Sequence, residues 1–209
     1  MKRSSWSKVR KRYDSWSKYY DAADKFPIIS RTGKGRRSEA VEVLKPKPGE
    51  TLLDLGCGTG EMLSIASRLC PEARLIGADF SPGMLERTKD KVPDCDALLA
   101  DVERMPFKDD SIDKVIASYT FTSVPDPEAC AREMLRIMRQ GGRASVLDTA
   151  RPKSIWWRIA TGPTRATARL AGYTYMDREI LPMLRKYFRV VKVISYSGGF
   201  VWCGLLEKR

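Results

Sequence analysis

The chain has 209 residues, 43% of them hydrophobic and 31% charged, with a formal net charge of +12, which fits one soluble globular domain. No apolar run approaches the roughly 18 residues of a membrane span, and five scattered cysteines without C-x-x-C pairing fit neither a disulfide framework nor a zinc site. The basic N-terminus lacks the apolar stretch of a secretory signal, so we expect a cytoplasmic protein.

The first 45 residues are interpreted as a separate helical cap. Aromatic and apolar residues recur at three- and four-residue steps from Ser4 to Ala23, which predicts an amphipathic helix. A second helix is expected from Gly33 to Leu44, where the prolines of Lys45–Gly49 end it. Residues 1–37 carry 12 Lys and Arg against 3 Asp, a net charge of +9. This charge favours an anionic partner, which would be a phospholipid surface, a phosphate-bearing substrate or nucleic acid; the alternative is a charged surface that only meets solvent.

From Thr51 onward, short apolar runs alternate with amphipathic helices, which predicts βαβ units and a parallel sheet. Strands are expected at Thr51–Leu55, Arg74–Ala78, Asp96–Ala100, Ile112–Ser118, Arg143–Asp148, Val190–Tyr196 and Val201–Glu207. Helices are expected at Glu61–Leu69, Pro82–Lys91, Pro127–Met138 and Asp177–Tyr187, with Gly141-Gly142 closing the third. Residues 50–209 are therefore predicted to form a Rossmann-like α/β domain: a seven-stranded, mostly parallel sheet with helices on both faces, preceded by the basic N-terminal helical extension.

An insertion at residues 149–176 separates the fifth strand from the next helix, and it is longer than such connections usually are. Ser154–Leu170 contains two tryptophans, apolar residues and several arginines, which predicts an amphipathic helix. This helix either meets an anionic surface or packs on the domain as a lid. Residues 151–189 carry 9 basic and 2 acidic residues, a net charge of +7, so all of the positive excess lies here and in residues 1–37.

A glycine-rich turn follows the first strand, and a helix follows the turn. Asp54 precedes the run Gly56-Cys57-Gly58-Thr59-Gly60, whose glycines let backbone N–H groups approach a ligand. Asp79 lies 19 residues after Gly60, at the end of the second strand, where a carboxylate can accept both hydroxyls of a ribose. The spacing is G-x-G-x-G rather than the G-x-G-x-x-G of dinucleotide sites. The pair therefore predicts a nucleoside site that does not bind NAD.

The runs LLDLGCGTG, GADFSPGMLERTK, LLADVERMPFKDDSIDKVIAS and MLRIMRQGGRASVLD resemble successive motifs of the class I S-adenosylmethionine (SAM)-dependent methyltransferases. The resemblance implies SAM as the cofactor, held at its methionine part by Asp54 and by the turn of Gly56, Cys57, Gly58 and Gly60. It places the ribose on Asp79. It places the adenine between Phe80 and Met84, with Asp101 at the amine and Val102 stacking. Ser118 and Tyr119 would line the face of methyl transfer.

The chain has no histidine, so the usual general base near neutral pH is absent. SAM needs no acid for its leaving group, and the candidates for a modest base or an acceptor-binding residue are Tyr13, Tyr19, Tyr20, Tyr119 and Asp148. Asparagine is also absent and Lys, Arg and Glu are abundant, which is typical of hyperthermophile sequences, so we expect a thermophilic source.

The methyl acceptor is open among several classes. YDSWSKYYD, GRRSEAVE and YTFTSVPDPE resemble soluble phospholipid N-methyltransferases, which implies a phospholipid head-group amine and a peripheral site on an anionic membrane. Quinone-biosynthesis C-methyltransferases are the second resemblance, and a soluble metabolite is a third acceptor. RNA ranks low, because the loop after the fourth strand lacks the Asn/Asp-Pro-Pro-Tyr pattern of amino-methylating nucleic-acid enzymes. The sequence does not indicate an oligomeric state.

Overall fold

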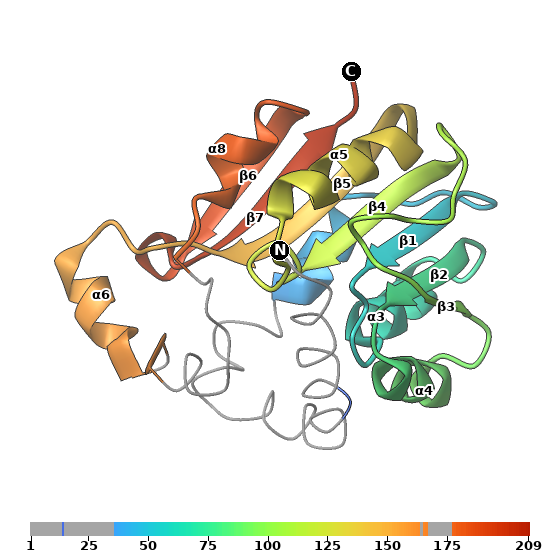
Figure 1. Ribbon diagram of the computed structural model, residues 1–209, viewed down its shortest axis with the longest axis horizontal. Helices are drawn as coiled ribbons and strands as arrows, with labels where there is room; N and C mark the ends of the chain where they lie inside the picture. The colour runs from blue at the N-terminus through green and yellow to red at the C-terminus, as the bar shows by residue number, and fades with distance from the viewer. Residues whose placement is uncertain (1–13, 15–35, 164, 167–176) are drawn as a thin grey trace.

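A seven-stranded sheet forms the centre of the computed structural model, which describes residues 14, 36–163, 165, 166 and 177–209 (Figure 1). Its strands lie in the order β3-β2-β1-β4-β5-β7-β6. Strand β7 runs antiparallel to β5 and β6, and the other strand pairs of this sheet are parallel. The strands are β1 (Thr51–Leu55), β2 (Arg74–Asp79), β3 (Asp96–Leu99), β4 (Ile112–Ser118), β5 (Met138–Thr149), β6 (Arg189–Tyr196) and β7 (Val201–Glu207). The predicted Rossmann-like fold class is confirmed.

Helices cover both faces of this sheet. They are α3 (Glu61–Leu69), α4 (Pro82–Lys91), α5 (Pro127–Ile137), α8 (Ile180–Leu184) and the helical residues 36–42, whereas α6 (Ile155–Ala160) lies away from the sheet. Alternate residues of a strand point to opposite faces: Leu53 of β1 packs with α5 and α8, whereas Leu52 packs with α3 and residues 40–44. The central strands are therefore buried on both sides, which explains their continuous apolar runs.

Capping residues fix two helix starts where the sequence predicted them. The hydroxyl of Ser81 accepts a hydrogen bond from the backbone N–H of Met84 at the start of α4. Asp126 accepts two from the first turn of α5. In both helices proline occupies the first turn, where its missing N–H has no intrahelical partner to lose.

The segment around Gly141 differs from the prediction. Helix α5 ends at Ile137, and Met138 already pairs with Ile112 as the first residue of β5. The register then shifts, so that Lys114 pairs with Arg143. Gly141, at φ 69°, lies in this irregular part of the strand and does not close the helix. A glycine that permits a bulge and a glycine that ends a helix look alike in the sequence.

Helix α8 is shorter than the predicted Asp177–Tyr187 helix. It begins at Ile180 and ends at Leu184, with Pro182 in its first turn. Proline is tolerated only near a helix start, because its ring clashes with the preceding turn and it lacks a donor. A helix that began at Asp177 would have placed Pro182 in its interior.

The N-terminal cap falls mostly outside the described residues. Of the predicted helix at Ser4–Ala23, the structure describes only Asp14, which is helical. The helical residues 36–42 match the end of the second predicted helix. Among the described residues, no helix combines the length and hydropathy needed to cross a bilayer.

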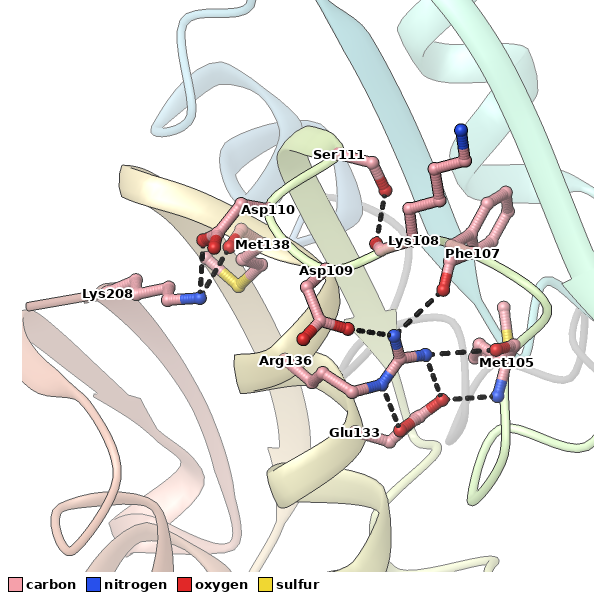
Figure 2. A network of polar contacts seen from close by, with 10 residues as sticks. All are labelled: Met105, Phe107, Lys108, Asp109, Asp110, Ser111, Glu133, Arg136, Met138 and Lys208. Atoms are coloured by element: carbon pink, nitrogen blue, oxygen red, sulfur yellow. Dashed lines mark hydrogen bonds and ion pairs between the residues drawn. The ribbon is translucent and has the colours of Figure 1, made fainter.

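Arg136 joins the loop between β3 and β4 to helix α5 (Figure 2). Its guanidinium donates to the carbonyl oxygens of Phe107 (2.8 Å) and Met105 (3.0 Å), and it pairs with Asp109 (2.6 Å) and Glu133 (2.6 Å). Glu133 in turn accepts from the backbone N–H of Met105 at 2.6 Å. These acidic partners raise the pKa of Arg136. The loop is thereby held against the helix.

Replacing Arg136 with alanine is expected to lower the free energy of unfolding by about 2 kcal/mol, because partly buried carbonyl and carboxylate groups lose a charged donor. Arg139→Ala is the matched control, since Arg139 pairs with Asp113 at an exposed position (55% of its side chain). That change should cost at most about 0.5 kcal/mol. Urea denaturation measures the free energy of unfolding of both variants. An equal decrease in the two would show that the Arg136 contacts do not stabilise the fold.

Candidate functional site

The glycine turn after β1 lies against the end of β2. The backbone N–H groups of Gly56 and Cys57 both donate to the carbonyl of Ala78, at 2.8 and 3.0 Å. Gly56, Gly58 and Gly60 have φ of 77°, 54° and 77°, the left-handed region that glycine enters without strain. The sharp turn thus depends on these residues.

The three glycines face different surroundings. A Cβ on Gly56 would lie 2.9 Å from the side chain of Thr120, and one on Gly60 would lie 3.0 Å from the Cα of Thr88. A Cβ on Gly58 would have no heavy atom within 4 Å. Gly56 and Gly60 therefore allow the turn to pack closely against neighbouring residues, whereas Gly58 borders open space.

The Asp79 carboxylate is fixed beside this turn at the end of β2. Its Oδ2 accepts from the N–H of Gly58 at 3.0 Å, and its Oδ1 accepts from the N–H of Ser81 at 2.9 Å. The residue is 6% exposed. Burial raises the pKa of Asp79 to about 6, although the backbone donors act in the opposite direction. The turn and the acidic residue, which are distant in sequence, therefore form one site.

Asp54 is a buried carboxyl group near the turn. It is 1% exposed, and neither of its oxygens has a hydrogen-bond partner in the described part of the chain. Burial and the nearby charge of Asp79 raise the pKa of Asp54 to about 8, while the charge of Arg37 lowers it. An unsatisfied buried carboxylate is costly. A ligand that carries a cationic or hydrogen-bonding group would satisfy it.

These features fit the cofactor that the sequence implies. The amino group of SAM would satisfy Asp54, its ribose hydroxyls would donate to Asp79, and the missing side chain of Gly58 would leave room for its approach. The individual roles of these residues remain proposals.

The residues predicted around the adenine lie in different environments. Phe80 is half-buried and Asp101 is exposed, with the Asp101 carboxylate accepting from the N–H of Glu103 at 2.9 Å. Met84 and Val102 are 1% and 6% exposed, so protein atoms already enclose both side chains. Val102 belongs to the hydrophobic core on the α5 face of the sheet. Val102 therefore contributes to packing, and its stacking on the adenine stays a prediction.

The side chain of Cys57 is buried in the turn. Its Sγ lies 3.7 Å from the hydroxyl of Thr88, which itself donates to the carbonyl of Gly58 at 2.8 Å. Burial raises the pKa of the Cys57 thiol well above its usual value. The contribution of its side chain is therefore to packing, and its backbone lies in the turn.

Ser118 and Tyr119 follow at the end of β4, next to the turn. Tyr119 has φ 56°, an unusual conformation for a residue with a side chain, and its N–H donates to the carbonyl of Leu147 at 2.7 Å. The guanidinium carbon of Arg37 lies 6.0 Å from the centre of the Tyr119 ring. The buried hydroxyl of Ser118 has no partner among the described residues. Both residues thus line the sheet edge that bears Asp54 and Asp79.

Asp148 at the end of β5 holds the loop that follows β4. It is 0% exposed and accepts from the hydroxyl of Thr122 (2.5 Å), the N–H of Thr122 (3.2 Å) and the N–H of Thr149 (2.7 Å). Burial raises the pKa of Asp148 to about 6. These contacts give Asp148 a positioning role, and its part in proton transfer remains a prediction. Tyr13, Tyr19 and Tyr20 lie outside the described residues.

Three residues at the site were missed by sequence reasoning. Arg37, 6% exposed, brings a positive charge to Asp54 and Tyr119. Thr120 donates to the carbonyl of Leu55 at 2.7 Å. Asp14 accepts from the hydroxyl of Ser81 at 2.5 Å and from the N–H of Gly83 at 3.3 Å, at the start of α4. No spacing in the sequence connects residues so far apart.

The chain is similar to known proteins in both sequence and fold. A family model described as a methyltransferase domain matches residues 53–146. The demethylmenaquinone methyltransferase of Listeria welshimeri is 30% identical over 189 residues, which cover 87% of this chain and 74% of that protein.

Two solved structures share the fold. A SAM-dependent methyltransferase from Thermotoga maritima has a TM-score of 0.70 at 22% identity, over 95% of this chain and 100% of that one. Geranyl diphosphate C-methyltransferase from Streptomyces coelicolor, solved with S-adenosyl-L-homocysteine, has a TM-score of 0.69 at 13% identity, over 84% and 76% of the two chains.

Proposed function

From the premise that this chain belongs to the class I SAM-dependent methyltransferases, and is an enzyme with SAM as its cofactor, we propose that it methylates a ring carbon of a demethylmenaquinone-type quinone. The observation that carries this proposal is the identity of 30% to a demethylmenaquinone methyltransferase, which extends over 87% of the chain. The aligned length is about twice that of the family-model match at residues 53–146. The similarity therefore reaches beyond the cofactor motifs.

The proposal favours the quinone ring, the second of the acceptors that the sequence suggested, over the phospholipid amine. The phospholipid head-group amine rested on the basic segments and on short N-terminal motifs. The relatives support the quinone-ring alternative instead. The soluble-metabolite and RNA alternatives have no comparable support.

The charges at the site also suit this acceptor. When bound, SAM supplies an electrophilic methyl group, and a reduced quinone ring attacks best when a neighbouring hydroxyl has lost its proton. Arg37 brings a buried positive charge near Tyr119, which would stabilise such an oxyanion and disfavour a protonated amine.

The test of the proposal is methyl transfer from labelled SAM to separate acceptors: reduced demethylmenaquinone, phosphatidylethanolamine, RNA and a water-soluble metabolite extract. Both lipids are presented in the same detergent micelles, so that access is equal. We expect label in the quinone. Label in phosphatidylethanolamine with none in the quinone would contradict the proposal and restore the amine alternative.

Arg37→Gln is expected to lower kcat on the quinone on the order of tenfold, because the oxyanion loses a charged partner. Arg36→Gln is the matched control, since Arg36 pairs with Glu39 and lies over the ring of Tyr196, at a more exposed position. Steady-state kinetics with quinone varied at saturating SAM separates this effect from cofactor binding. An equal loss in both variants would remove Arg37 from the acceptor site.

Binding of SAM is expected to release a proton below the Asp54 pKa of about 8, because the free carboxyl is protonated there and pairing with an ammonium requires the ionised form. Above that pH, no proton should be released. Calorimetry in buffers of different ionisation enthalpy measures the number of protons released on binding, and Asp54→Asn should abolish the release. Release that persists in Asp54→Asn would assign the proton to another group.

The same group links stability to pH. Because the folded pKa of Asp54 is raised from 3.8 to about 8, the folded chain without ligand binds this proton more tightly than the unfolded chain. Protonation of Asp54 therefore contributes to the free energy of unfolding. This contribution is fully present below the unfolded pKa of 3.8 and is lost as the pH rises through the folded pKa of about 8.

A further inference from the structure

Helix α6 exposes an unusual number of apolar side chains. Half of the large hydrophobic residues that are exposed in the described part of the chain lie in this one short helix. Trp156 is 78% exposed, Ile159 63% and Ile155 59%, and α6 contains no buried residue. Figure 1 shows α6 at the periphery of the molecule, away from the sheet. A lid packed on the domain would bury these side chains.

The orientation of α6 is set by its opposite face. A Cβ on Gly198, in the turn η1 (Ser197–Gly199), would lie 2.0 Å from the indole of Trp157, so this ring rests directly on the bare glycine. Thr161, four residues after Trp157, is buried. At 100° per residue, Ile155, Trp156 and Ile159 lie on the other side of the helix. They form the outer face of α6.

Contacts on the C-terminal side tie this region to the domain. Arg165 pairs with both carboxylate oxygens of Asp177, at 2.7 and 2.5 Å. Arg178 donates to the carbonyls of Val124 and Pro125 in the loop after β4, at 2.6 and 3.1 Å. The outer face of α6 is therefore presented by a structured part of the chain.

Positive charges accompany the outer face of α6. Arg151 and Lys153 are exposed and Arg158 is half-buried, and residues 149–166 contain no acidic residue. Tryptophan with flanking cations is the combination that favours the boundary between lipid head groups and acyl chains. A second protein would not need the unbalanced charge, whereas an anionic bilayer attracts it.

We propose that the outer face of α6 docks on the surface of an anionic phospholipid bilayer. The helix follows β5, whose C-terminal end lies on the sheet edge that carries Asp54, Asp79 and Tyr119. Docking there brings the cofactor site to the membrane in which a quinone is dissolved. This purpose rests on the proposed function, but the docking itself does not.

The test is co-sedimentation of the full-length protein with phosphatidylcholine vesicles, with and without phosphatidylglycerol. Trp156→Glu is expected to weaken partitioning into the anionic vesicles on the order of tenfold, because an interfacial apolar group is lost and a repelled charge is gained. Leu69→Glu, at an exposed apolar position of α3, introduces the same charge and should change the partitioning into anionic vesicles little. Arg151→Gln should weaken binding about fivefold, and added salt should weaken it further.

Unchanged partitioning of Trp156→Glu would overturn the proposal, and so would binding that Leu69→Glu weakens equally. A concentration-dependent dimer that Trp156→Glu dissociates would instead identify the occupant as a second copy of the chain. SAM binding and the melting temperature of each variant verify its fold. The assay contains no methyl acceptor, so failure of docking and failure of the proposed function are separate results.

Discussion

Asp79→Ala is expected to weaken SAM binding by about two orders of magnitude. The carboxylate is held by the N–H groups of Gly58 and Ser81, and it is the acceptor proposed for both ribose hydroxyls. Hydrogen bonds to a charged group contribute roughly 1.5–3 kcal/mol each, so losing the pair accounts for a change of this size at the lower end of that range. The backbone donor of Gly58 would also lose its partner, which loosens the turn.

Isothermal titration with SAM measures the effect, and Asp79→Asn separates charge from shape. The asparagine variant keeps one acceptor and should lie between the alanine variant and the unchanged protein. Asp96→Ala is the matched control, because Asp96 is an exposed carboxylate at the start of β3, paired with Arg74. Unchanged affinity in Asp79→Ala would refute the ribose assignment.

The second large effect is expected from Gly58→Ala, which should weaken SAM binding on the order of a hundredfold. The added methyl group would occupy the space in which the backbone of the turn approaches the cofactor. The change should leave the chain folded, because its Cβ meets no protein atom within 4 Å. The left-handed conformation should lower the free energy of unfolding by about 1–2 kcal/mol.

Gly49→Ala gives a control for that backbone strain. Gly49 has φ 77° and likewise no heavy atom within 4 Å of its added Cβ, but it lies in the loop before β1. Thermal melts should show similar destabilisation for the two variants, and titration should show a loss of affinity in Gly58→Ala alone. Normal SAM affinity in Gly58→Ala would mean that the open space beside Gly58 is not part of the cofactor site.

Most of the fold could be predicted because its signals are local. The bounds of β1, α3, α4, β4 and β7 agree with the sequence prediction, since capping residues, prolines and glycines punctuate the chain at those points. The start of β5 was not predictable, because the sequence does not distinguish a bulge at Gly141 from a helix end. The length of α8 could have been predicted from Pro182, which restricts where that helix begins.

The candidate site likewise has one part that the sequence predicts and another that only the fold reveals. Its glycine turn and Asp79 could be found from one strand–turn–helix pattern and one spacing. Arg37, Asp14 and the buried contacts of Asp148 depend on segments that only the fold brings together. The outward orientation of α6 depends on the seating of Trp157 on Gly198, and no periodicity encodes that contact.

The basic segments bear on which surface the protein binds, whereas the relatives bear on which acceptor it methylates. Net positive charge indicates that a surface favours anions, but it carries no information on which atom receives a methyl group. The charge therefore suggested a phospholipid acceptor, whereas the relatives favour a quinone that shares the membrane with phospholipid. A thermophilic source and the role of the N-terminal tyrosines remain predictions.

Mass spectrometry of the product is the most direct test of the account. Purified protein and SAM with a deuterated methyl group would be incubated with reduced demethylmenaquinone in anionic vesicles that contain phosphatidylethanolamine. The quinone and the phospholipid would then be extracted and fragmented. The account predicts that the deuterated methyl group stays with the ring fragment, bound to carbon, and that Gly58→Ala greatly reduces this product. A deuterated methyl group found on the lipid amine or on a ring oxygen, with none on ring carbon, would contradict it.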